Sequence, residues 1–195
     1  MRKIFRNLDV FSIKNYLGNI EDKEGIIECI KRNQLSNLKI DKGYDFPLTQ
    51  DYNSFFYTLH NKIQTDFKKI FNCTISEKSW QTCNSYMSDK DNYAEQWHNH
   101  IETGVLSAIY YFNIPCKTSI NFLCERNEKL FTHSPSNDEL LIFPSHLYHK
   151  PNRCFGDGYR ISINLDVLCK ESSRELFSRI KKQNQLTKFL QWILK

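Results

Sequence analysis

Two histidines and a carboxylate alternate in the stretch WHNHIE, at His98, His100 and Glu102. In an extended strand, side chains at every second position point to the same face, so these three would be neighbours. Imidazole and carboxylate groups are ligands for iron, zinc, nickel and copper. Incidental histidines also produce an isolated H-x-H, but packing rarely needs three such groups on one face. The stretch therefore predicts part of a metal site.

A distant histidine is available to complete this site. The stretch LLIFPSHLYHKP runs from an apolar segment into His146 and His149. Two ligands close in sequence plus one remote histidine form a facial triad, which leaves three coordination positions open. We predict His149 as the remote ligand and assign His146 to a loop or to the rim of the pocket.

Arg160, Ser162 and Asn164 alternate in YRISINLDV, which begins shortly after His149. An arginine that points inward from a strand is costly unless an anion meets it. Its planar guanidinium matches a carboxylate with two parallel hydrogen bonds, and a nearby hydroxyl adds another. The alternative is a surface arginine on an edge strand. A metal beside a carboxylate-binding arginine indicates a dicarboxylate cosubstrate.

The order H-x-(D/E/H), a β-rich stretch, His and then R-x-S resembles the iron(II)- and 2-oxoglutarate-dependent oxygenases over residues 80–167. AIYYFN is similar to a strand of the prolyl-hydroxylase branch whose second tyrosine, here Tyr111, contacts the 2-oxoglutarate carboxylate. NSYMSDKDNYAEQWH is similar to the preceding strand and loop, which makes Tyr86 a second candidate for this contact. ELLIFPSHLYHKPN and YRISINLDV are similar to the second half of the pattern, in particular in small bacterial and phage oxygenases. Tyr110 and Phe112 would face the other side of their strand and pack in the core.

The resemblance leaves two sets of metal ligands open. In one set His100 and Glu102 supply the usual H-x-E, whereas in the other His98 is the first ligand and His100 replaces the acid. Some small members of the family also have H-x-H here, and His149 belongs to both sets. We slightly favour His98 and His100, with Glu102 either a ligand or an acceptor that orients a histidine.

Helical periodicity surrounds a β-rich middle of the chain. Apolar residues have helical spacing over 23–33, 54–71 and 173–195. Short runs of β-branched and aromatic residues, separated by turn sequences, predict strands over 79–87, 104–114, 119–125, 139–145 and 159–167. This spacing is typical of an antiparallel sandwich or jelly roll.

We therefore expect one α+β domain with helices flanking the β core. The resemblance implies that this core is a double-stranded β-helix, or jelly roll. The predicted domain covers residues 1–195, with a helical N-terminal part over 1–77, the β core over 78–168 and a C-terminal helix over 172–195.

Composition narrows the compartment and the partners. The chain has seven cysteines, an odd number with no C-x-x-C pair, which favours a reducing, cytoplasmic setting over a disulfide framework or a zinc ribbon. No signal-peptide core and no apolar run of membrane-spanning length occurs in the sequence. The net charge of +5 leaves nucleic acid as a minor alternative partner.

The resemblance implies a hydroxylase that uses iron(II), 2-oxoglutarate and O2. Iron would be held by His149 and two members of the WHNHIE set, and a protein or peptide side chain is the first candidate substrate. Alternatives are a cupin-like metal enzyme without 2-oxoglutarate, such as a three-histidine dioxygenase, a non-catalytic β-sandwich binding module, or a relative that binds metal without turnover. The implied contacts to 2-oxoglutarate are Arg160, Ser162, Tyr111 and Tyr86.

Overall fold

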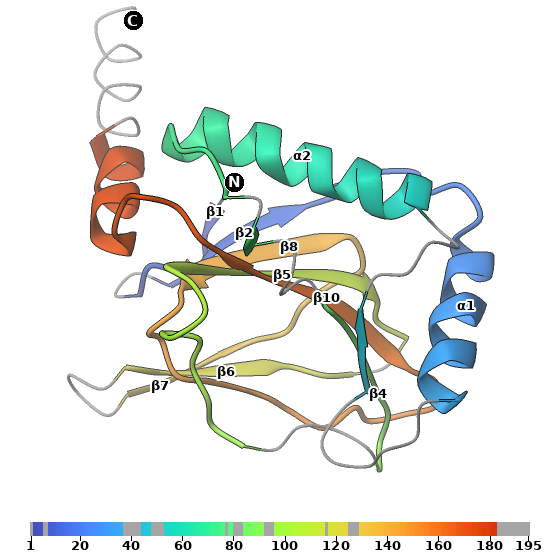
Figure 1. Cartoon of the computed structure of the whole chain (residues 1–195). Helices are drawn as coiled ribbons and strands as arrows, with labels where there is room; N and C mark the ends of the chain where they lie inside the picture. Colours follow the sequence, from blue (N-terminus) through green and yellow to red (C-terminus); the bar gives the residue numbers. More distant parts are fainter. Residues whose placement is uncertain are drawn as a thin grey trace, which may run out of the picture.

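Two antiparallel β-sheets face each other, and helices cover the outer face of the larger sheet (Figure 1). The computed structural model describes residues 2–5, 8–36, 44–47, 53–76, 78–79, 84–91, 96–115, 117–124 and 129–182. Antiparallel sheets with few helices agree with the predicted α+β class, whereas closure of a double-stranded β-helix stays a prediction. Within the described ranges, no helix is long and apolar enough to cross a membrane.

The larger sheet has the strand order β1-β2-β8-β5-β10-β4-β3. Four of these strands fall in the predicted β-rich region: β4 (Asn84–Ser88), β5 (Leu106–Asn113), β8 (Glu139–Pro144) and β10 (Arg160–Val167). The N-terminal part adds three strands that the sequence analysis did not predict: β1 (Arg2–Lys3), β2 (Phe11–Lys14) and β3 (Tyr44–Pro47). Strands of this length are too short to give a periodic signal, so the N-terminal part is less helical than we expected.

The smaller sheet has the strand order β7-β6-β9. Its strands are β6 (Ile120–Cys124), β7 (Lys129–His133) and β9 (His149–Pro151), of which only β6 was predicted. Strand β9 begins with His149, the residue predicted as the remote metal ligand. It pairs with β6 through Phe122 opposite His149.

The helices lie where their periodicity predicted them. Helix α1 spans Lys23–Ser36 and α2 spans Asn53–Phe71. A third helix covers 173–182, and the rest of the predicted C-terminal helix lies outside the described residues. Ser172 and Glu175 cap its first turn, because the Ser172 N–H donates to Glu175 Oε2 at 2.8 Å and the Glu175 N–H donates to Ser172 Oγ at 3.4 Å.

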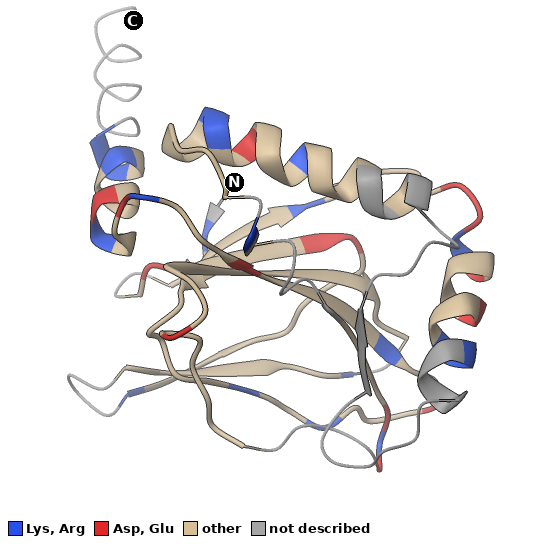
Figure 2. Cartoon of the chain, viewed as in Figure 1, with Lys and Arg blue, Asp and Glu red and all other residues tan. Residues whose placement is uncertain are grey.

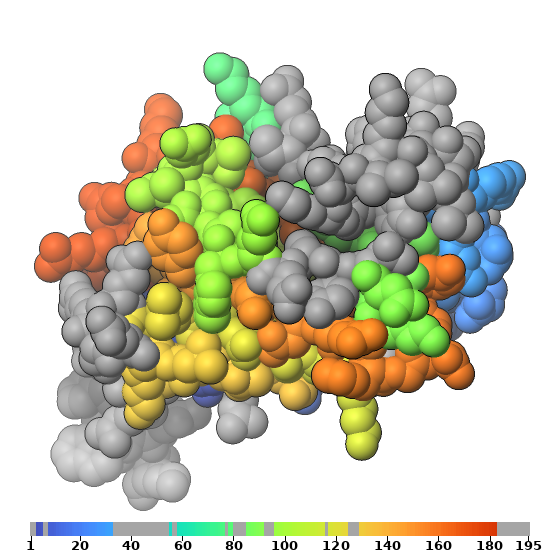
Figure 3. All heavy atoms as spheres, turned by 90° about the horizontal axis from the view of Figure 1, so that it is seen from below, coloured from blue at the N-terminus to red at the C-terminus, as the bar shows by residue number. Residues whose placement is uncertain are grey.

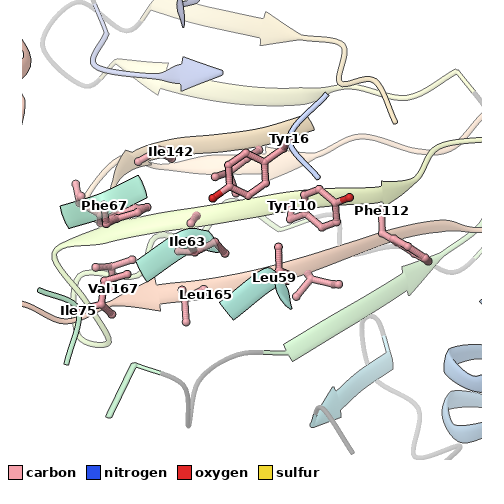
Figure 4. Close-up of a cluster of buried hydrophobic side chains, with 14 of the residues drawn as sticks. Tyr16, Leu59, Ile63, Phe67, Ile75, Tyr110, Phe112, Ile142, Leu165 and Val167 are labelled. Carbon is pink, nitrogen blue, oxygen red and sulfur yellow. The ribbon is translucent and has the colours of Figure 1, made fainter. Parts of the chain in front are cut away.

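One core lies between α2 and the larger sheet (Figure 4). Leu59, Ile63 and Phe67 form the buried face of α2. Tyr110 and Phe112 on β5 point toward these residues, as their alternation with Tyr111 predicted. A second core, which includes Tyr111, lies on the other face of β5, between the two sheets. Both faces of β5 are therefore buried, one against α2 and the other between the sheets.

The sequence predicted no disulfide framework, but one of the described cysteines forms a disulfide bond. Cys73, Cys124 and Cys169 are free thiols, whereas the buried Cys154 is disulfide-bonded. Disulfides form between residues that are close in space, which sequence spacing does not reveal.

Glu139, at the start of β8, is a fully buried carboxylate. It accepts hydrogen bonds from Ser12 Oγ at 2.6 Å, from His133 Nε2 at 2.8 Å, and from the Ser136 N–H and Oγ, both at 2.8 Å. Burial raises its pKa, but the hydrogen bonds from His133, Ser12 and Ser136 outweigh this effect and lower the pKa from 4.5 to about 2. Glu139 is therefore ionised in the folded protein at neutral pH.

The free energy of unfolding should consequently fall in acid. A carboxyl group with a lowered pKa in the folded state stabilises fully above its unfolded pKa and loses this contribution as the pH drops toward the folded pKa. We expect a loss of about 2 kcal/mol between about pH 5 and pH 3 from Glu139. Urea unfolding of wild type and Glu139→Gln at both pH values measures it, and an equally steep decline in the variant would contradict the assignment.

Candidate active site

In the described part of the chain, charged residues lie mainly on the helices and loops, and the strands carry fewer of them (Figure 2). Among the strand residues of the larger sheet whose burial the structure describes, Glu139, Arg160 and Asp166 are charged and nevertheless buried. Glu139 has a structural role, as described above. Arg160 and Asp166 both lie on β10, on the face that β10 turns toward the smaller sheet.

Three imidazoles from two distant segments meet between the sheets. One ring nitrogen from each of His98, His100 and His149 lies within 4.8 Å of the others. The backbone joins the two segments, because the His98 N–H donates to the His149 carbonyl at 3.1 Å and the His149 N–H donates to the His98 carbonyl at 2.9 Å. Figure 3 shows the lime-green atoms around residue 100 beside the orange atoms around residue 150.

The hydrogen bonds of the three rings leave the Nε2 atoms available. Nδ1 of His98 lies 3.0 Å from the carbonyl oxygen of Gln96, and Nδ1 of His149 lies 3.1 Å from that of Leu147. Nδ1 of His100 lies 3.1 Å from Oδ2 of Asp166. Each acceptor favours the tautomer that carries its proton on Nδ1. In this tautomer Nε2 has a free lone pair and can bind a metal ion.

Burial also favours the neutral form of two of these rings, those of His98 and His149. His149 is 1% exposed, and burial, followed by His98 and His100, lowers its pKa well below 6.5. Burial lowers the pKa of His98 as well. Metal coordination requires neutral imidazole, so the pocket favours the coordinating form of His98 and His149.

Glu102 does not join this group. The expectation that the strand continues through residue 102 is wrong, because the chain turns over 101–103. The His100 carbonyl accepts hydrogen bonds from the Thr103 N–H at 3.1 Å and the Gly104 N–H at 3.2 Å, which closes the turn and leaves Glu102 exposed. Of the two ligand sets inferred from the sequence, the structure brings together the three histidines.

Replacing Glu102 should therefore have little effect on metal affinity. We expect Glu102→Ala to bind cobalt(II) within about threefold of wild type, as for other exposed positions. His100→Ala, measured in the same anaerobic calorimetric titration, should bind far more weakly. If the two variants exchanged these outcomes, His100 would not be a ligand and Glu102 would be one.

Strand β10 arranges four polar residues along one face: Arg160, Ser162, Asn164 and Asp166. Ser162 pairs in register with Tyr86 on β4 and with Tyr111 on β5, so these three side chains form a row across the sheet. Together with the three histidines, Tyr86, Tyr111, Arg160, Ser162 and Asn164 line a cavity of about 280 Å³. A cavity at the lower end of the range for ligand pockets suits a small ligand.

Arg160 is an inward-facing cation on a central strand. It is 6% exposed, and β10 lies between β5 and β4, so the alternative of a surface arginine on an edge strand is wrong. Its Nη1 donates to Thr118 Oγ1 at 3.0 Å and to the Asn152 carbonyl at 3.1 Å. Among the described residues, no carboxylate lies within 4.0 Å of its guanidinium. Burial lowers its pKa, since removing the cation from water is unfavourable without a counter-ion.

The tyrosines differ in their surroundings. Tyr111 is 3% exposed, and burial raises its pKa, so its hydroxyl stays protonated and can donate a hydrogen bond into the cavity. Tyr86 is half-buried on the opposite side of Ser162. The buried Oδ1 of Asn164 has no hydrogen-bond partner within the part of the chain that the structure describes. The cavity thus places the Tyr111 hydroxyl, a hydrogen-bond donor, and Asn164 Oδ1, an acceptor, around the buried guanidinium of Arg160.

Sequence reasoning missed two sets of residues at this site. Asp166 continues the alternation of YRISINLDV, so its position was readable although we did not single it out. Thr118 and Asn152, which hold the guanidinium of Arg160, come from loops and gave no sequence signal.

Comparison with known proteins rests on structure. No family model and no curated protein matches the chain by sequence. A prolyl hydroxylase from Trichoplax adhaerens, solved with a hypoxia-inducible-factor peptide, aligns with a TM-score of 0.65 at 14% identity over 87% of this chain and 86% of its own. A Pseudomonas putida prolyl-4-hydroxylase aligns with a TM-score of 0.56 at 12% identity, covering 83% and 94%.

A third similar structure is HygX from Streptomyces hygroscopicus, solved with nickel and 2-oxoglutarate bound. It aligns with a TM-score of 0.53 at 12% identity, over 81% of each chain. At sequence identities this low, the structural similarity establishes the fold alone. The chain therefore has the fold of the iron(II)- and 2-oxoglutarate-dependent oxygenases, the superfamily that the order of its motifs indicated.

Proposed function

We propose that this protein is an iron(II)- and 2-oxoglutarate-dependent oxygenase that hydroxylates a C–H bond. The observation that carries the proposal is one cavity with three convergent imidazoles and a buried arginine that lacks a carboxylate partner among the described residues. A small dicarboxylate with a 2-oxo acid group would chelate a metal at one end and neutralise the arginine at the other. The fold it shares with HygX, a structure that holds nickel and 2-oxoglutarate, supports the same pairing.

The histidine cluster fits a transition metal. Neutral imidazole nitrogens suit iron, zinc, copper and nickel, and a facial arrangement leaves positions open for a bidentate ligand and O2. In this proposal His98, His100 and His149 hold iron(II) through Nε2. Iron, when bound, supplies the activation of O2 that is coupled to decarboxylation of 2-oxoglutarate to succinate.

The protein contributes binding and orientation. Arg160 receives the distal carboxylate of 2-oxoglutarate with two parallel hydrogen bonds, because its guanidinium is already fixed by Thr118 and Asn152. The Ser162 and Tyr111 hydroxyls stand beside it and donate to the same carboxylate. Tyr86 completes the row on the other side of Ser162.

The substrate proposed is a side chain of a protein or peptide. One relative by fold was solved with a peptide, which supports this class. Trp97 and Ile101, which flank the metal-binding histidines, are 39% and 63% exposed and offer apolar contact at the surface. Such exposed apolar groups next to a site favour a partner that covers them.

Reconstitution with iron(II) tests this function. Protein is loaded with iron(II) in the absence of oxygen and then given O2 and 2-oxoglutarate. It should form succinate, measured by mass spectrometry, in proportion to the O2 consumed, measured with an oxygen electrode. Oxygen use without 2-oxoglutarate would instead indicate a three-histidine dioxygenase, an alternative that the all-imidazole cluster favours. Metal binding without oxygen use would indicate an inactive relative, and absence of metal binding a binding module.

A further inference from the structure

We propose that Asp166 supplies, through His100, the negative charge that a ligating carboxylate supplies in an H-x-D or H-x-E site. The inference rests on the proposed function, in which His100 takes the position of that acid. Asp166 does not reach the metal in this arrangement, so it is a positioning residue. The charge lies one imidazole ring further from the metal than usual.

The geometry around Asp166 joins it to His100. Oδ2 of Asp166 lies 3.1 Å from Nδ1 of His100 and accepts a hydrogen bond from Thr103 Oγ1 at 2.6 Å. Oδ1 accepts a hydrogen bond from Ser107 Oγ at 3.2 Å, and Ser107 lies opposite Asp166 in the β5–β10 register. The carboxylate is therefore held in one orientation, and that orientation fixes the tautomer of His100.

The backbone brings His100 onto this carboxylate. The His100 N–H donates to the Ser145 carbonyl at 2.7 Å, and the turn that follows His100 packs against β10. A Cβ atom at Gly104 would lie 2.9 Å from the Val167 carbonyl oxygen, so only glycine permits this close approach. The chain is thus shaped to hold His100 between Asp166 and the other two histidines.

A bound cation would balance the negative charge of the buried Asp166 carboxylate. It is 8% exposed, and within the described ranges His100 is the sole basic side chain within 4.0 Å of its carboxylate. A buried carboxylate is costly without a positive partner. A divalent ion on Nε2 of His100 would supply this partner, because the imidazole transmits the attraction between the ion and Asp166.

Glu139 provides a matched control elsewhere in the same sheet. It is also buried, lies 2.8 Å from a histidine nitrogen, at His133, and accepts hydrogen bonds from two serine hydroxyls. His133, however, is not part of the histidine cluster. Loss of charge at Glu139 should therefore affect stability, whereas loss of charge at Asp166 should affect the metal.

The test is a titration with cobalt(II), followed by calorimetry and by the visible absorption of the bound ion, without 2-oxoglutarate or oxygen. Asp166→Asn, which keeps the size of the side chain, should bind cobalt about 10- to 100-fold more weakly than wild type. Glu139→Gln should bind within about threefold of wild type. Thr103→Val, on the exposed turn, frees the carboxylate without removing its charge and should fall between the two, with a shifted cobalt spectrum.

A rescue distinguishes charge from simple support. The double variant His100→Asp/Asp166→Asn moves the carboxylate to the metal and should recover most of the affinity that Asp166→Asn loses. Unchanged affinity in both Asp166→Asn and Thr103→Val, or a double variant no better than Asp166→Asn, would overturn the proposal. Because cobalt binding needs no cosubstrate, a protein that showed this dependence on Asp166 but never bound 2-oxoglutarate would refute the oxygenase function and leave this inference standing.

Discussion

Replacing His149 by alanine should remove metal binding from the protein. His149 belongs to the cluster, with its ring centroid 4.3 Å from that of His98 and 5.1 Å from that of His100, and it is the most buried of the three rings. If the free energy of a protein metal site divides roughly evenly among its ligands, the loss of one weakens binding by about 100- to 1,000-fold. Anaerobic calorimetry with iron(II) or cobalt(II) measures this change.

His146→Ala is the matched control, because His146 is exposed and lies on the same segment. We expect it to bind metal as wild type does. Metal bound by His149→Ala with near wild-type affinity would show that the histidine cluster is not the site.

His149→Ala should also alter how the free energy of unfolding depends on pH. The folded protein keeps His149 neutral, whereas the unfolded chain takes up a proton below about pH 6.5. The free energy of unfolding of the metal-free wild type should therefore fall as the pH drops below that value. His149→Ala lacks this contribution, so its decline should be shallower in urea unfolding experiments.

Replacing Arg160 by alanine should abolish tight binding of 2-oxoglutarate and leave metal binding intact. Truncating one partner of a buried, hydrogen-bonded charge pair costs about 2–5 kcal/mol, which is about 30- to 5,000-fold in affinity. The unliganded variant should be at least as stable as wild type, because it no longer buries a cation without a counter-ion. Calorimetric titration of cobalt-loaded protein with 2-oxoglutarate measures the affinity.

Arg153→Ala controls for loss of positive charge, since Arg153 is an exposed arginine that forms an ion pair with Asp91 at 3.5 Å. Arg160→Lys keeps the charge but cannot form two parallel hydrogen bonds, so its affinity should lie between those of wild type and Arg160→Ala. Lost metal binding with unchanged 2-oxoglutarate affinity in Arg160→Ala would reverse the roles assigned to the two groups.

Long periodic elements were predictable from the sequence. The apolar face of α2 repeats over several turns, and the alternation around Tyr111 correctly separates the core side of β5 from the cavity side. Short elements were not predictable, because β1, β2 and β9 depend on partners that are far away in the chain. Strand β9 forms where His149 pairs with Phe122 and with His98, and no local sequence pattern predicts that pairing.

The candidate site was predictable to the extent that it follows strand alternation. Arg160 and Ser162 lie on the cavity face because β10 is regular there. Alternation gave a wrong prediction at Glu102, because the hydrogen bonds to the His100 carbonyl end the extended segment two residues earlier. Asp166 obeys the alternation, but its contact with His100 depends on the turn before Gly104, which only the folded backbone reveals.

In the proposed function, the histidine cluster, through its metal ion, and Arg160 bind the two ends of one 2-oxoglutarate molecule. Titration of the iron(II) protein with 2-oxoglutarate in the absence of oxygen tests it most directly, because the metal chelate has a weak charge-transfer band in the visible spectrum. We expect the band to appear in wild type and to require far more 2-oxoglutarate in Arg160→Ala. Wild-type protein that holds iron but shows no such band at saturating 2-oxoglutarate would contradict the claim.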